Sequence, residues 1–206
     1  MAYRIPTRTV VDEIKSTAMT AFKTYRDMSD GAGLGTAPES FLQHQIAVSL
    51  WKKEVFPWVT TEDTLKNVYD NRKNPVDGRK IRGSKSGRFD VLCWGDHEAP
   101  ALAIEIKKCW EVEACDKDAK RLAKWVTAGG LDMGMIVAYQ QAWKRETIVD
   151  RLEGVRSCIR QAIQPHKCAL RSTASHVAGP HRVSDEGYRD WWWSIACLLI
   201  ENDKSG

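Results

Sequence analysis

The sequence predicts a single α/β domain, residues 1–206, in which helices flank a mixed central sheet. Residues 89–94 and 101–107 are two apolar runs separated by turn-forming and polar residues, which is the pattern of a strand hairpin. Residues 133–139 are a third apolar run, expected to be a central strand in parallel pairing. Segments with apolar residues three and four apart precede and follow these strands, which indicates helices.

Two helices are predicted ahead of the hairpin. Residues 7–28 carry apolar side chains at helical spacing, and so do residues 38–55, where Glu39 lies near the positive end of the expected helix. Residues 58–60 read as a short extended piece. Residues 65–69 fit a first strand or a short helix, and the pattern does not decide between them.

Helices and strands are also predicted after the hairpin. Residues 109–127 form a helix with acidic residues first and basic residues last, which suits the helix dipole. Residues 147–163 carry apolar side chains on one helical face. Residues 169–177 are a candidate extra strand, and the tryptophan-rich residues 188–200 are predicted to be a C-terminal helix.

Composition is that of an ordinary globular protein, with 43% hydrophobic and 28% charged residues. Apolar runs stay below the roughly 18–20 residues that span a membrane, and the N-terminus lacks the apolar core of a signal peptide. The six cysteines are scattered without a CxxC motif, which favours thiols in a reducing compartment. We therefore expect a cytoplasmic protein without a membrane segment.

Three charged residues interrupt the two hairpin strands. Glu105 and Lys107 share one face of the second strand because side chains alternate, and Asp90 stands on the first strand. Carboxylate oxygens suit Mg²⁺, which takes one or two carboxylates together with water and substrate phosphate. A neighbouring lysine can activate a metal-bound water or neutralise charge on a phosphate. The alternative is a solvated strand face, on which Glu-x-Lys pairs are common.

Asp90, followed after fourteen residues by Glu105-Ile106-Lys107, resembles the motif of the PD-(D/E)xK nuclease superfamily. The run Gly87-Arg88-Phe89-Asp90 is also similar to that superfamily, although no proline precedes the aspartate. The resemblance covers residues 38–140 and implies a restriction-endonuclease-like αβββαβ core. The N-terminal helix and the C-terminal elements, residues 145–200, would pack on that core.

The resemblance implies a metal-dependent nuclease that hydrolyses phosphodiester bonds, either as an endonuclease or as an exonuclease. DNA is the expected substrate, and RNA stays open. Asp90 and Glu105 would bind Mg²⁺, for which Mn²⁺ could substitute, with the Ile106 carbonyl as a further ligand. Lys107 would orient or activate the attacking water.

The helix at residues 38–55 stands where the superfamily has its first helix, which often presents another Glu or Gln to the metal. Glu39 is the best candidate to complete the catalytic site, Gln43 shares its face one turn later, and Glu54 is a weaker third. Favourable placement of an acid at a helix N-terminus accounts for Glu39 equally well.

A basic segment precedes Asp90. Residues 66–88 contain eight Lys or Arg and two Asp, a surplus larger than the net charge of +4 of the whole chain. Such a flank suits the approach of a polyanion to a carboxylate site, and a solvated loop is the alternative. The candidate nucleic-acid-binding residues are Arg79, Lys80, Arg82, Lys85 and Arg88.

A second hypothesis is a catalytically silent nuclease fold that binds nucleic acid or serves as a scaffold subunit of a complex. The expected helix at residues 188–200 would cap the core and could offer a face to a second copy or a partner, and one of its tryptophans could stack on a base. The complete acid–acid–lysine set favours the active enzyme.

Overall fold

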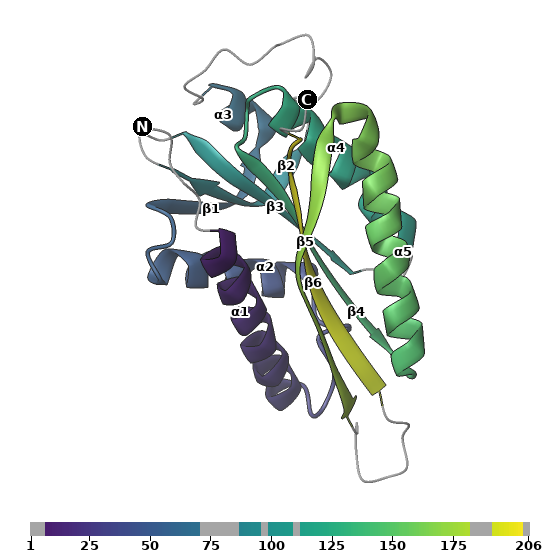
Figure 1. Cartoon of the computed structure of the whole chain (residues 1–206). Coiled ribbons are helices and arrows are strands. Elements are labelled where there is room, and N and C mark those ends of the chain that lie inside the picture. The colour runs from purple at the N-terminus through teal and green to yellow at the C-terminus, as the bar shows by residue number, and fades with distance from the viewer. Residues whose placement is uncertain (1–6, 71–86, 96–98, 109–111, 182–190, 204–206) are drawn as a thin grey trace.

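The computed structural model describes residues 7–70, 87–95, 99–108, 112–181 and 191–203, without the side chains of residues 172 and 173. It is an α/β fold with a six-stranded mixed sheet flanked by helices (Figure 1). The helices and strands are α1 (Thr7–Met28), α2 (Glu39–Lys52), β1 (Trp58–Thr64), α3 (Leu65–Asp70), β2 (Arg88–Trp94), β3 (Pro100–Lys108), η2 (Val112–Cys115), α4 (Asp116–Thr127), β4 (Met133–Ala142), α5 (Arg145–Ile163), η3 (Gln164–His166), β5 (Cys168–His181) and β6 (Trp191–Asn202).

The strand order is β1-β2-β3-β4-β6-β5. Strands β3 and β4 are parallel, and every other neighbouring pair is antiparallel. Helix α4 makes the crossover that a parallel pair requires, since a tight turn cannot join two parallel strands. The predicted parallel pairing of the strand at residues 133–139 is therefore confirmed.

Two hydrophobic clusters lie on opposite faces of the sheet. Helices α1 and α2 cover one face, and α4 and α5 cover the other (Figure 1). Strand β3 contributes to both clusters, because Ile104 and Ile106 point toward α1 and α2 while Ala103 points toward α4. The sheet is thus the middle of three layers, and the charged positions of β3 lie under a helix.

Most predicted elements are present with shifted ends. The helix predicted at 109–127 begins later, as the short turn η2 followed by α4, and residues 109–111 lie outside the described part of the chain. The extended piece at 58–60 is the start of strand β1, the undecided residues 65–69 are the helix α3, and the candidate strand at 169–177 is the longer strand β5.

The prediction of a C-terminal tryptophan-rich helix is wrong. Residues 191–202 form strand β6, which lies between β4 and β5, and residues 188–190 lie outside the described part. Trp191 and Trp193 pack in the cluster under α1, while Leu198 and Ile200 pack in the opposite cluster. A strand that is buried on both faces is apolar nearly throughout, so the sequence lacks the alternation that marks a half-exposed strand.

Because residues 191–200 belong to strand β6, the helix that was predicted to offer a dimer or complex interface is not formed there. Trp191 is fully buried and Trp193 is 4% exposed, so both rings contribute to the core instead of an outer face. Trp191, Trp193 and His181 surround Phe22 of α1, with ring centroids 4.6–5.4 Å from that of Phe22. These aromatic contacts fix α1 against β5 and β6.

The packing of α5 can be tested with two identical substitutions. Val155 is fully buried and Val149 is 43% exposed on the same helix. We expect Val155→Ala to lower the free energy of unfolding by about 2 kcal/mol because it leaves a cavity, and Val149→Ala to change it by less than about 0.5 kcal/mol. Chemical denaturation measures both, and equal effects would contradict the described face of α5.

Candidate functional site

Strands β2 and β3 stop pairing at the predicted acidic residues. Their ladder runs from Trp94–Pro100 to Val91–Ile104, and the same register would next place Asp90 opposite Glu105. Instead, Oδ2 of Asp90 accepts a hydrogen bond from the backbone N–H of Ile106 at 2.7 Å. A side chain thus replaces the strand ladder at this point, while β3 continues beside β4 as far as Lys108.

Glu105 and Lys107 both reach helix α4, as strand alternation predicts for residues two apart. The Glu105 side chain is 1% exposed, and its Oε1 accepts a hydrogen bond from Nη2 of Arg121 at 2.5 Å. The Lys107 ammonium lies 3.2 Å from Oδ2 of Asp118. Because Arg121 also bonds Oδ1 of Asp118 at 2.7 Å, the four side chains form one chain of alternating charges.

Sequence reasoning missed the role of Asp118 and Arg121. The acid-then-base order in α4 was explained by the helix dipole alone, which accounts for exposed charges on a helix. Asp118 and Arg121 are three apart, and each is four residues before a fully buried residue, Leu122 or Trp125. The helical spacing of Asp118 and Arg121 from core residues was the signal in the sequence that could have identified them.

Burial dominates the electrostatics of the two acids. It raises the pKa of Glu105 to about 8, and the charges of Asp90 and Asp118 add to this shift, against the opposing pull of Arg121. Burial also raises the pKa of Asp90, against the hydrogen bond from Ile106 and the charge of Lys107. Burial therefore works against the ionised form of both acids, and a neighbouring cation works in its favour.

The pKa of Lys107 is shifted in the direction that keeps its side chain charged. Burial works to lower the pKa of Lys107, but the charge and hydrogen bond of Asp118, with the charges of Asp90 and Glu105, raise it on balance. Lys107 is thus an ammonium group at neutral pH, held in place by an acid of α4.

Helix α2 braces the point where β2 and β3 separate. Oε1 of Glu39 accepts the backbone N–H of Lys108 at 2.9 Å. One turn later, Nε2 of Gln43 donates to the backbone carbonyl of Asp90 at 2.7 Å and to Oε1 of Glu62 at 3.0 Å. Glu39 therefore holds β3 and Gln43 holds β2, on the two sides of the separation.

Glu62 is a further acid that sequence reasoning did not identify. It lies on β1 with a positive φ of 55°, a conformation that L residues seldom adopt, and its charge raises the pKa of Asp90. Its Oε2 lies 3.9 Å from Nη1 of Arg88. Arg88 is the candidate nucleic-acid-binding residue that the structure describes, whereas Arg79, Lys80, Arg82 and Lys85 lie outside the described residues.

The chemistry of the two acids fits a hard divalent cation. Within the described ranges, no group of three or more His, Cys, Asp or Glu side chains is arranged to hold a metal. Mg²⁺ requires fewer protein ligands than such a group, because one or two carboxylates with water and phosphate suffice. Asp90 is half-buried and Glu105 is buried, and they stand on two neighbouring strands just beyond the last paired residues, which is a donor set of that kind.

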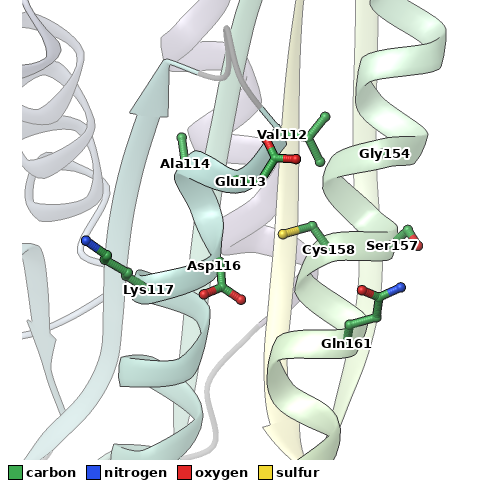
Figure 2. A pocket seen from close by; sticks show the side chains of 9 residues that line it. All are labelled: Val112, Glu113, Ala114, Asp116, Lys117, Gly154, Ser157, Cys158 and Gln161. Carbon is green, nitrogen blue, oxygen red and sulfur yellow. The ribbon is translucent and has the colours of Figure 1, made fainter.

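A cavity of about 780 Å³ lies elsewhere, between the start of α4 and the middle of α5 (Figure 2). Figure 2 shows Glu113 of η2 with Asp116 and Lys117 of α4 on one side, and Cys158 of α5 on the other. Burial raises the pKa of the Cys158 thiol, which disfavours the reactive thiolate. None of the β2 or β3 acids lines this cavity, so it is separate from the candidate site.

Neither the scan against protein-family models nor the searches of curated proteins and of solved structures found a match to this chain. Among the described helices, none combines the length and apolar character that crossing a membrane demands. We therefore infer function from the geometry of the site.

The raised pKa of Glu105 predicts a pH-dependent stability in metal-free buffer. The folded protein holds this proton up to about pH 8, whereas an unfolded chain releases it near an ordinary glutamate pKa of about 4.3. Its stabilising contribution is full below that ordinary value and is lost as the pH rises through 8, by several kcal/mol at about 1.4 kcal/mol per pKa unit.

Thermal unfolding of the wild type and of Glu105→Gln in EDTA, between about pH 5 and pH 8, measures this loss. The variant is expected to lose less stability than the wild type over this range. Glu146→Gln, at an exposed position of α5, should behave like the wild type. Parallel curves for the wild type and Glu105→Gln would contradict the burial of an ionisable carboxyl at this position.

Proposed function

We propose that this protein is a metal-dependent nuclease that hydrolyses phosphodiester bonds, with DNA as its substrate. The observation that carries the proposal is the hydrogen bond that Asp90 accepts from the backbone of Ile106, the residue next to Glu105, where β2 and β3 separate. Lys107 lies two residues after Glu105 on the same strand. A carboxylate pair with an adjacent ammonium group suits a metal ion, a water molecule and a phosphate together.

The order of elements supports a restriction-endonuclease-like core. Helix α2 is followed by β1, β2, β3, α4 and β4, which is the order αβββαβ with the short helix α3 inserted. The acids stand on the second and third of these strands, as the resemblance implies. On the cysteine pattern of the sequence, we further propose that the protein acts in the cytoplasm.

The side chains of the site would have different roles in the reaction. Asp90 and Glu105 would hold Mg²⁺ or Mn²⁺, with the Ile106 carbonyl as a proposed third ligand. When bound, the ion supplies an activated water and stabilises charge on the phosphate. Lys107, oriented by Asp118, would position that water or the phosphate oxygen through its ammonium hydrogens.

Two further residues would act at the edge of this site. Glu39 would act as a positioning residue through the backbone of Lys108, since that is where its carboxylate is bonded. Arg88 would contact phosphate, which contributes affinity without sequence information.

Incubation with plasmid DNA and Mg²⁺ tests the activity. The wild type is expected to cleave, and Asp90→Ala, Glu105→Gln and Lys107→Ala are expected to lose at least about 100-fold in rate, because each removes a group that acts on the reacting atoms. Lys144→Ala, an exposed residue just ahead of α5, is the matched control for loss of a lysine. Cleavage by the three variants at the wild-type rate would reject the proposal.

One observation favours a second candidate, a catalytically silent fold that binds nucleic acid or serves as a scaffold. Glu105 and Lys107 already have partners in Arg121 and Asp118, so this charge network is complete without a metal. Retention of a labelled DNA duplex in EDTA, without cleavage of DNA or RNA when Mg²⁺ or Mn²⁺ is added, would identify this alternative. Binding and cleavage that both depend on the ion would identify the nuclease.

A further inference from the structure

We propose that Arg121 is an exchangeable counter-ion: its guanidinium neutralises Glu105 in the metal-free protein and leaves that carboxylate when a divalent cation binds, while Asp118 retains it. This inference rests on the proposed function, since it concerns the same carboxylate. It assigns α4 the control of metal affinity, a role that neither the motif nor the helix pattern indicated.

Glu105 requires a positively charged partner. Its side chain is 1% exposed, and an unpaired carboxylate at that depth costs several kcal/mol. Nη2 of Arg121, at 2.5 Å, is the cation that the structure places on it. This ion pair therefore stabilises the metal-free state whenever Glu105 is ionised.

Arg121 has two other contacts that can hold it when a divalent cation binds Glu105. The same Nη2 bonds Asp118 at 2.7 Å on its own helix, and the guanidinium carbon lies 5.7 Å from the ring centroid of Phe89. Both contacts can persist when the bond to Glu105 is broken. The arginine side chain is 25% exposed, whereas that of Glu105 is 1% exposed, so the arginine is the partner with room to move.

Arg121 and a divalent cation compete for the Glu105 carboxylate. Binding of a divalent ion to the Glu105 carboxylate is weakened by Arg121 on Oε1, because two positive charges a few ångströms apart repel each other strongly where the dielectric is low. The free energy of the Arg121–Glu105 pair is therefore subtracted from metal binding. Strengthening the hold of Asp118 on Arg121 favours the metal, and weakening it favours the ion pair.

Isothermal titration with Mg²⁺ alone, without nucleic acid, measures this competition. We choose about pH 9, where protons compete least for the carboxylates. Arg121→Gln is expected to bind Mg²⁺ about tenfold more tightly than the wild type, the equivalent of one charged hydrogen bond. Arg121→Lys, which keeps the charge, should bind more weakly than Arg121→Gln.

A second variant and a matched control extend the test. Asp118→Asn should bind Mg²⁺ several-fold more weakly than the wild type, because Arg121 then loses the carboxylate that competes with Glu105 for its guanidinium. Lys124→Gln removes a positive charge from an exposed position of the same helix and should match the wild type. Circular dichroism melting shows that each variant is folded. If Arg121→Gln does not fold, Arg121→Met, which keeps the aliphatic part of the side chain and removes the charge, takes its place with the same expected result.

The outcomes separate the two proposals. Absence of Mg²⁺ binding by the wild type, or binding that Glu105→Gln leaves unchanged, overturns the proposed metal site and this inference with it. Binding that Glu105→Gln abolishes, but that Arg121→Gln does not tighten, overturns the role of Arg121 and leaves the metal site standing. Tighter binding in Arg121→Gln with weaker binding in Asp118→Asn supports both.

Discussion

The burial of the Glu105 carboxylate constrains everything around it. A charge that is 1% exposed is tolerated only beside an opposite charge, and helix α4 supplies that charge through Arg121. Asp118 then binds both Arg121 and Lys107, so two residues of one helix turn neutralise Glu105 and Lys107 of the strand. The position of α4 over β3 is thus fixed by electrostatics as well as by packing.

The separation of β2 from β3 depends on hydrogen bonds from helix α2 and on one hydrogen bond between the two strands. On one face, α2 bonds the backbone of both strands, through Gln43 to β2 and through Glu39 to β3. Between the strands, the Asp90 carboxylate takes the N–H of Ile106, which would otherwise lose a partner. The two acids are held at this separation because the backbone there bonds to the side chains of Gln43, Asp90 and Glu39.

The sequence predicted the hairpin, the parallel strand and the shared face of Glu105 and Lys107, because period-two and period-three-to-four patterns are local properties of the chain. It failed at Trp191–Asn202, where burial on both faces erased the strand alternation. It also missed Asp118 and Arg121. Their role depends on which face of α4 meets β3, and that is set by tertiary packing.

The central claim is that the Asp90 and Glu105 carboxylates form one cation site. Anomalous diffraction from a crystal soaked in Mn²⁺ tests it most directly. We expect a peak within coordination distance of both carboxylates, about 2.0–2.3 Å, with the Arg121 guanidinium moved off Glu105 and still on Asp118. A crystal in which Mn²⁺ binds elsewhere, or nowhere, while Glu105 stays bonded to Arg121 would contradict the account.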